Sequence, residues 1–183
     1  MAPEPQQSFD VAPFFRTSPH VQNVVDKLAK DGGIEERGAI FTRIEVVNFI
    51  LDLAGYTSDQ PLYERRILEP AVGQGSFLLP ITARLLDSAS RHHCLNAATL
   101  RDAIRGVELH KETFNSVKTL LSDKLRSAGL SANEALDLAN HWLLQGDFLL
   151  TNIEGNFDYV VGNPPYVRQE SIPGWGRRLQ RGA

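Results

Sequence analysis

Residues 67–79 constrain the fold of this chain more than any other stretch of its sequence. A short apolar run at residues 67–68 leads into a turn that contains Gly73 and Gly75, and an apolar helical pattern follows. The apolar positions of that helix are Ile81, Leu85 and Leu86. A strand that passes through a glycine-rich turn into a helix is the opening unit of a doubly wound α/β fold. Glycines let a ligand approach the backbone, and the start of a helix favours a bound carboxylate, so we expect a ligand site at this turn.

Length and composition are those of one soluble domain. The chain has 183 residues, of which 42% are hydrophobic, and it contains no apolar run long enough to span a bilayer. Residues 1–19 are rich in Pro and Gln without periodicity, which predicts a disordered arm before a folded domain at 20–170 and an irregular tail at 171–183. The amino terminus lacks the pattern of a secretory signal, so we expect a cytoplasmic protein. A formal net charge of -3 argues against a domain that grips a nucleic-acid backbone unaided.

Two further runs predict strands that carry an acid near their carboxyl end. The run at 104–109 carries Glu108, and the run at 142–149 carries Asp147. In Rossmann-type sites an acid at the end of the second strand accepts hydrogen bonds from ribose hydroxyls, which makes Glu108 the candidate. Glu108 lies further from the glycines than the usual roughly twenty residues, so we expect an extra helical turn or loop at 96–103. On its own, the Gly-Asp pair that includes Asp147 favours a turn.

Helix-start signals mark two further elements. Thr42 and Glu45 have the spacing of a capping box, and the apolar helix that follows is expected to end at Gly55. Ser131 and Glu134 have the same spacing before a shorter helix. Between these elements, one helix face is predicted to carry Phe114, Val117, Leu121 and Leu125. These helices are expected to be scaffold, and no residue spacing indicates a metal site.

An apolar run at residues 158–162 ends in Asn163, Pro164, Pro165 and Tyr166. This pattern predicts a buried strand that stops abruptly, because proline donates no backbone hydrogen bond and ends ladder pairing. Each proline also restricts the residue before it, so the Asn163 amide and the Pro164 carbonyl are expected to point in fixed directions. With an aromatic ring beside them, these groups can hold a planar group that carries an exocyclic amine, such as adenine. The alternative is that the segment only forms a turn.

The Asn-Pro-Pro-Tyr segment resembles the motif of amino-group methyltransferases, and residues 167–170 resemble adenine-specific DNA methyltransferases of restriction-modification type. Residues 69–75 are similar to the methyltransferase signature Asp/Glu-Pro-x-x-Gly-x-Gly. Residues 38–42 are similar to a Gly-x-x-Phe/Tyr-Thr-Pro segment that precedes the glycine-rich loop in these enzymes, with Arg43 in place of the usual proline. The motifs occur in family order, which is more specific than any one of them. The resemblance is to the amino-terminal part of gamma-type, type IIG-like N6-adenine methyltransferases.

This resemblance implies a Rossmann-like class I methyltransferase fold, with the first four strands of a doubly wound sheet in the order 3-2-1-4 and helices on both faces. It implies S-adenosylmethionine as cofactor, no metal, and methyl transfer to the exocyclic N6 of adenine in DNA. Glu69 would face the methionyl ammonium of the cofactor, Glu108 its ribose and Asp147 its adenine amino group. The implied catalytic residues are Asn163, Pro164, Pro165 and Tyr166. The implied cofactor-binding residues are Phe41, Thr42, Glu69, Pro70, Ala71, Gly73, Gly75, Glu108, Leu109, Asp147, Phe148 and Asn163.

Two other functions stay open at this point. Glutamine methyltransferases that act on peptide-chain release factors also end a strand in Asn-Pro-Pro-Tyr, because a glutamine amide presents the same paired hydrogens. The second alternative is a non-catalytic fragment that at most binds cofactor. Methyltransferase sheets of this type continue with further strands and a target-recognition domain, whereas a short tail follows Tyr166 here. We therefore expect weak or no activity from the chain alone, and completion by a downstream segment or subunit.

Overall fold

The computed structural model describes residues 42–163, which belong to the second of the two compact units of the chain, Gly38–Ala183. Several sequence-based expectations lie outside the described residues: the arm at 1–19, the tail at 171–183, Phe41, Pro164, Pro165 and Tyr166. Among residues 42–163, no helix combines the length and the apolar character needed to cross a membrane.

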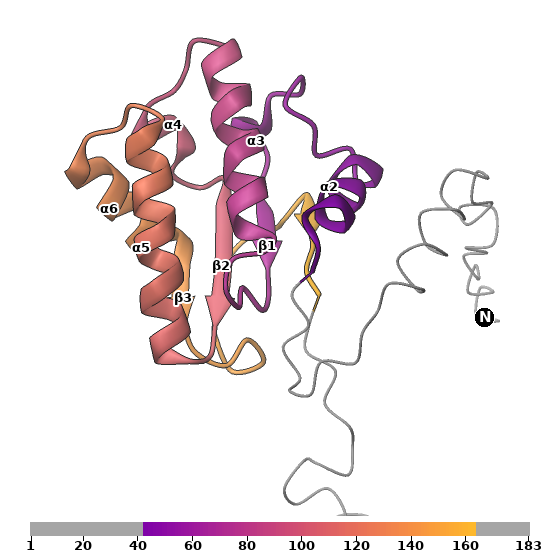
Figure 1. The fold of residues 1–183 in the computed structure, drawn as a ribbon, viewed down its shortest axis with the longest axis vertical. Helices are drawn as coiled ribbons and strands as arrows, with labels where there is room; N and C mark the ends of the chain where they lie inside the picture. Colours follow the sequence, from indigo (N-terminus) through magenta and orange to yellow (C-terminus); the bar gives the residue numbers. More distant parts are fainter. Residues whose placement is uncertain (1–41, 164–183) are drawn as a thin grey trace, which may run out of the picture. The chain divides into compact units, whose positions relative to one another are not determined.

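Within residues 42–163, four parallel strands form one sheet in the order β3-β2-β1-β4 (Figure 1). The strands are β1 (Ile67–Glu69), β2 (Ile104–Glu108), β3 (Leu143–Gln145) and β4 (Tyr159–Val160). This confirms the α/β class and the strand order predicted from the sequence. The sheet grows from β1 to β3 in one direction and returns to place β4 on the other side of β1. The switch point therefore lies between β1 and β4, where doubly wound sheets bind their ligands.

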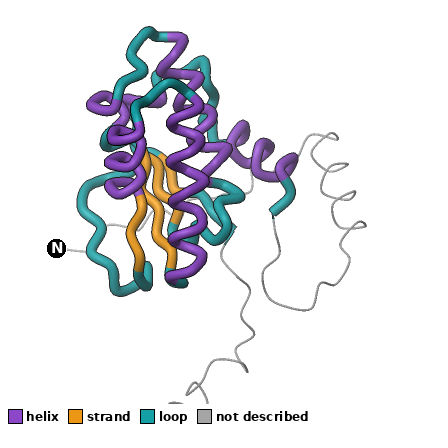
Figure 2. Tube along the Cα trace, turned by 60° about the vertical axis from the view of Figure 1, so that its left-hand side comes forward, coloured by secondary structure: helices purple, strands orange, loops and turns teal. Residues whose placement is uncertain are grey.

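Helices pack beside this sheet, and Figure 2 shows the strands gathered in one layer next to them. The helices are α2 (Ile44–Leu53), α3 (Leu78–Arg91), α4 (Ala97–Leu100), α5 (Lys111–Ser127) and α6 (Ala132–Trp142), with a 3-10 turn at Leu62–Glu64. In Figure 1, α3 and α5 lie side by side over the strands, and α2 packs next to α3. The connection from β3 to β4, residues 146–158, contains no helix. It therefore does not supply the helix that we expected on a second face of the sheet.

The predicted apolar helix faces form the core of the described unit. Ile81 and Leu85 of α3 are fully buried, as are Val117, Leu121 and Leu125 of α5. Their spacing of three or four residues places them on one side of each helix, which faces the sheet. The sequence prediction for both helices is confirmed.

Two of the predicted helix signals are also found. The Ser131 side chain accepts a hydrogen bond from the Glu134 backbone N–H, and Glu134 Oε2 accepts one from the Ser131 backbone N–H at 2.9 Å, which completes the capping box of α6. The extra helical turn expected between β1 and β2 is α4, whose first turn is capped by Asn96 Oδ1 accepting from the Thr99 N–H at 3.0 Å. Both caps satisfy backbone donors that the first turn of a helix leaves without a partner.

The capping box predicted at Thr42 is wrong. Helix α2 begins one residue later than that box requires, with Arg43 at the N-cap position and no side-chain hydrogen bond at the cap. The Thr42 hydroxyl instead accepts a hydrogen bond from Asn163 Nδ2 at 3.2 Å. A partner distant in the sequence has replaced the local cap. The other end of α2 agrees with the prediction, because Gly55 follows it with φ +72°.

The predicted third strand was too long at both ends. Trp142 is the last residue of α6, and its indole N–H donates to the backbone carbonyls of Leu100 and Arg101 at 3.2 and 2.9 Å. The ring is fully buried, so its polar N–H needs these acceptors. At the other end, β3 stops at Gln145, and the turn around Asp147 follows.

The start of β4 is anchored by Asp158. Its Oδ2 accepts from the Arg66 backbone N–H at 2.8 Å, and its Oδ1 accepts from Arg65 Nη1 at 3.2 Å. The Arg66 backbone N–H is the largest of the causes that hold the Asp158 pKa below its ordinary value. Asp158 therefore fixes the position at which the chain enters β4, and with it the segment that leads to Asn163.

Gly106 of β2 lies where side chains from two other segments close over the sheet. A Cβ at this position would lie 2.7 Å from Val72 Cγ2 and 3.1 Å from Leu143 Cδ2. We expect Gly106→Ala to lower the free energy of unfolding by about 1–3 kcal/mol, because both contacts are tighter than van der Waals packing allows. Urea unfolding followed by circular dichroism measures the change. The matched control is Gly162→Ala, whose Cβ would meet nothing closer than Pro70 Cδ at 3.6 Å; equal losses in the two variants would contradict the prediction.

Candidate functional site

Most of the described candidate site residues lie along the edge of the sheet where the strands end. Glu69 is the last residue of β1 and Glu108 is the last residue of β2. Asp147 follows β3 after one intervening residue, and Asn163 comes shortly after β4. All four strands are parallel, so their carboxyl ends meet at one edge. These four residues, which are far apart in the sequence, therefore lie in a row along this edge of the sheet.

Glu108 connects this edge to the glycine-rich loop. Its Oε2 accepts from the Gly73 backbone N–H at 2.7 Å, and its Oε1 accepts from the His110 backbone N–H at 2.8 Å. The side chain is buried. Each carboxylate oxygen can accept two hydrogen bonds, so each still has room for one more donor. Glu108 thus holds the loop in place and remains able to accept from a ligand.

The loop itself requires glycine at two positions. Gly73 and Gly75 have φ +54° and +86°, in the left-handed region that other residues rarely adopt. At Gly75 a Cβ would also lie 2.8 Å from Val117 Cγ2 of α5. The loop is therefore packed closely against α5 on one side, and its bare backbone is available on the other.

Glu69 is a buried carboxyl group with an unsatisfied oxygen. The residue is 2% exposed, and its Oε2 has no hydrogen-bond partner among the described residues. Burial raises its pKa well above the ordinary value, the nearby Glu108 carboxylate raises it further, and the Leu78 backbone N–H opposes the rise. Buried polar atoms almost always have a partner, so an unsatisfied one marks a place where a donor from a ligand fits. A cationic donor suits this oxygen best, since a second carboxylate lies close by.

Asn163 lies at the switch point between β1 and β4. Its side-chain Nδ2 donates to Thr42 Oγ1 at 3.2 Å, which links the end of β4 to the start of α2. Next to it, a cavity of about 220 Å³ is lined by Pro70, Ala71, Val160, Val161 and Gly162. Pro70 and Ala71, which were predicted to bind the cofactor, thus lie beside the end of β4.

Asp147 forms the turn that its sequence favours. Its Oδ1 accepts from the Leu149 backbone N–H at 2.9 Å, and its backbone carbonyl accepts from the Thr151 hydroxyl at 2.6 Å. The turn lies just beyond the end of β3, so the turn is confirmed and the acid lies at the carboxyl end of a strand as expected. Phe148 is half-buried and Leu109 is 54% exposed, so both present apolar surface near the row of acids.

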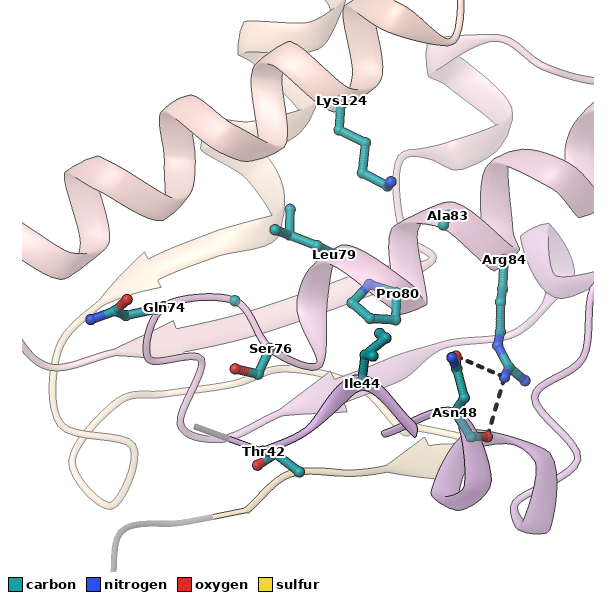
Figure 3. A pocket seen from close by; sticks show the side chains of 11 residues that line it. Thr42, Ile44, Asn48, Gln74, Ser76, Leu79, Pro80, Ala83, Arg84 and Lys124 are labelled. Carbon is teal, nitrogen blue, oxygen red and sulfur yellow. Dashed lines mark hydrogen bonds between the residues drawn. The ribbon is translucent and has the colours of Figure 1, made fainter. Parts of the chain in front are cut away.

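A second, larger pocket of about 590 Å³ opens between α2 and α3 beside the glycine-rich loop (Figure 3). Its lining includes Thr42 together with Gln74, Gly75 and Ser76 of the loop, Pro80, Arg84 and Lys124. Of the residues that line this pocket, only Thr42 and Gly75 were predicted from the sequence as site residues. The spacing of four residues between Pro80 and Arg84 is the signal that could have found this face of α3.

Arg84 fixes the wall of this pocket. Its Nη1 donates to Asp52 Oδ1 at 2.6 Å and to the Tyr56 carbonyl at 2.9 Å, and its Nη2 donates to the Asn48 carbonyl and side chain at 3.2 Å (Figure 3 shows the Asn48 contacts). These bonds hold α2 against α3. Thr42 lies just before the Arg43 N-cap of α2, so these bonds also limit how far it can move relative to α3.

Comparison with known proteins gives the family. Residues 67–181 match the model of the Eco57I restriction-modification methylase. The Type II methyltransferase M.PaeR7I of Pseudomonas aeruginosa is 59% identical over 155 residues, which are 84% of this chain and 27% of that protein. M.XhoI of Xanthomonas vasicola is 46% identical and M.BstVI of Geobacillus stearothermophilus 43% identical, each over 142 residues, covering 76% and 74% of this chain and 26% and 25% of the relative.

The chain therefore spans about a quarter of the length of the relatives that it matches. The family match alone covers more than half of the chain, from β1 onward, and the resemblance inferred from the sequence motifs is confirmed. With its parallel sheet in the order β3-β2-β1-β4, this chain belongs to the Eco57I restriction-modification methylase family.

Proposed function

We propose that this chain is the cofactor-binding, amino-terminal part of an enzyme that transfers a methyl group from S-adenosylmethionine to N6 of adenine in DNA. The observation that carries the proposal is the row of acceptors at the carboxyl edge of the sheet. Glu69, with its unsatisfied Oε2, and the buried Glu108 lie at neighbouring strand ends, and Asn163 follows at the switch point. Doubly wound sheets bind nucleotides at this position.

The described residues fit the proposed cofactor. The unsatisfied Oε2 of Glu69 would accept from its ammonium group, and the free acceptor sites of Glu108 would accept from its ribose hydroxyls. Gly73 and Gly75 keep the loop backbone bare enough for close approach. When bound, S-adenosylmethionine supplies a methyl group activated by a positively charged sulfur. Asp147 and Phe148 are proposed to receive its adenine ring.

Asn163 is proposed to act on the methyl acceptor. An aryl amine is a poor nucleophile, because its lone pair is delocalised into the ring. An amide oxygen that accepts one of the amine hydrogens localises that pair and stabilises the positive charge that develops on nitrogen. Pro164 and Tyr166, outside the described residues, are proposed to contribute a second acceptor and a stacking surface worth about 1–3 kcal/mol for a base taken out of the duplex.

We further propose that the chain alone transfers methyl groups weakly or not at all. Strand β4 lies at the edge of the described sheet, and its Val160 side chain is 63% exposed. An open, apolar edge favours pairing with another segment. The net charge of -3 also provides little attraction for a DNA backbone. A downstream segment or second subunit is the proposed source of both further strands and DNA contacts.

The direct test is radiolabelled methyl transfer to genomic DNA, with the chain alone and with the downstream segment added in trans. N6-methyladenine should be recovered after hydrolysis of the DNA when both parts are present. Label on cytosine would contradict the adenine assignment. Label on a protein instead of DNA would favour glutamine methylation, and robust transfer by the chain alone would overturn the need for a second segment.

We expect Glu108→Ala to weaken binding of S-adenosylhomocysteine by at least about 1 kcal/mol, because hydrogen bonds to a charged group contribute on that scale. Isothermal titration calorimetry measures the change. Glu154→Ala, which removes an exposed carboxylate outside the site, is the control. Equal affinities for the wild type and Glu108→Ala would remove Glu108 from the ribose site.

A further inference from the structure

The hydrogen bond between Thr42 and Asn163 has no role in helix capping or in the sheet. It joins two residues 121 positions apart, the residue before the N-cap of α2 and the residue at the switch point. The contact is partly buried. Asn163 Nδ2 is the donor and Thr42 Oγ1 the acceptor. The side-chain oxygen of Asn163 has no hydrogen-bond partner among residues 42–163.

The orientation of an asparagine amide decides what it can bind. One end is an acceptor and the other carries two donors. A target amine presents hydrogens, so it needs the oxygen end, and the amide nitrogen in that place would put donor against donor. Because Asn163 donates one N–H to Thr42, its amide is oriented so that the side-chain oxygen remains free to accept a hydrogen bond from a ligand. The orientation therefore matters as much as the presence of the residue.

We propose that Thr42 is a positioning residue, whose hydroxyl holds the Asn163 amide with its oxygen directed to the methyl acceptor. The inference rests on the proposed function of Asn163 and deepens it. Thr42 is suited to the task because it lines an open pocket, where solvent or a ligand can accept its hydroxyl proton (Figure 3). Its oxygen is then left to accept from Asn163.

The support behind Thr42 makes this contact rigid. Arg84 binds α2 at Asn48, in the middle of the helix, and at Asp52, near its end, which holds the helix that follows Thr42 against α3. On the other side, β4 is paired with β1 from the Ile67–Tyr159 register onward. Both ends of the hydrogen bond thus lie within three residues of an element that is held in place, and a short side chain of threonine size spans the gap.

The test compares Thr42→Val, which keeps the shape and removes the hydroxyl, with Thr42→Ser, which keeps the hydroxyl. The first measurement is nuclear magnetic resonance of the ¹⁵N-labelled Asn163 side-chain amide in the full chain, assigned by the signal that Asn163→Asp removes. In Thr42→Val we expect the two amide protons to shift toward solvent values and to exchange with water about 10-fold faster, because the bond that protects them is gone. Thr42→Ser should restore the wild-type signals. Thr119→Val, which removes an exposed hydroxyl from α5, is the matched control.

The second measurement is methyl transfer with the downstream segment added in trans. Thr42→Val should lower kcat about 10-fold, because the reacting group is misplaced, and should change KM for S-adenosylmethionine less than kcat, and Thr42→Ser should recover kcat. Unchanged amide signals in Thr42→Val overturn the proposal, as does a shifted amide with unchanged kcat, or a loss confined to cofactor KM. Thr42→Ala repeats the comparison if the valine variant does not fold. If the amide signals change in Thr42→Val as expected but the wild-type complex methylates no adenine, the proposed function is refuted and the contact itself stands.

Discussion

Replacing Asn163 with alanine should lower methyl transfer at least about 100-fold, the scale of removing one preorganised dipole from a reacting centre. The affinity for S-adenosylhomocysteine should not change. The reason is that the open acceptor of Asn163 faces the methyl acceptor in the proposed reaction, while its nitrogen is bonded to Thr42. Single-turnover transfer with the downstream segment in trans measures the rate, and calorimetry measures the affinity.

The comparison needs a control that changes an asparagine without touching the site. Asn133→Ala, on the exposed side of the first turn of α6, is suitable and should behave as the wild type. The family resemblance also counts Asn163 among the cofactor-binding residues. A loss of affinity together with rate would assign it that role, and a wild-type rate in Asn163→Ala would remove it from catalysis.

Local patterns predicted the scaffold of this site well. The strand, glycine-rich turn and helix at residues 67–79, the periodic face of α5 and the capping box at Ser131 all involve partners within a few residues of one another. Their physical causes are therefore visible in a single stretch of sequence. The strand order followed from the family resemblance, and the structure has the same order.

Two of the errors, the cap at Thr42 and the start of the third strand, share one cause, which is a partner far away in the chain. A capping box at Thr42 is locally reasonable, but the hydroxyl bonds Asn163 instead. An apolar run from Trp142 is locally a strand, but the indole N–H donates to the carbonyls of Leu100, the last residue of α4, and Arg101, and Trp142 remains in helix α6. Neither competing contact leaves a signal at spacings of two, three or four residues.

Burial of the acids could not be predicted for the same reason. The sequence places Glu69 at a strand end, but it does not reveal that one oxygen is closed off from solvent and from every polar partner among the described residues. It also does not reveal that Glu108 is already occupied by two backbone N–H groups. These features separate the two acids: Glu69 has an oxygen open to a cationic donor, whereas Glu108 holds the glycine-rich loop in place.

Glu69→Gln should weaken binding of S-adenosylhomocysteine by about 1.5–3 kcal/mol, or about 10- to 150-fold, because it removes the charge that would pair with the methionyl ammonium. The affinity for 5′-methylthioadenosine, which has the same nucleoside and no ammonium, should stay the same. This ligand is the matched control for the loop and the ribose site. Calorimetry with both ligands decides the assignment, and equal losses for the two would show that the substitution damages the site as a whole.

The same substitution should make stability less dependent on pH. Burial and the Glu108 carboxylate raise the pKa of Glu69 in the folded protein, so the folded chain keeps this proton after the unfolded chain has released it. Stability should therefore fall as pH rises from the ordinary carboxyl range toward the raised pKa, with a slope of at most about 1.4 kcal/mol per pH unit for one proton. Glutamine does not titrate, so the Glu69→Gln variant should lack this part of the slope and gain stability relative to the wild type as pH increases.

Urea unfolding of both proteins across pH 5 to 9, without ligand, measures this difference. Other carboxyl groups titrate in both proteins and cancel in the comparison, including Asp158, whose pKa is lowered by the Arg66 backbone N–H. A stability difference that is constant with pH would mean that Glu69 is ionised in the folded state over this whole range. The specific expectation is that Glu69→Gln binds the cofactor product more weakly than the wild type but is more stable at high pH. This combination is expected of a carboxylate whose burial is unfavourable unless a bound cation pairs with it.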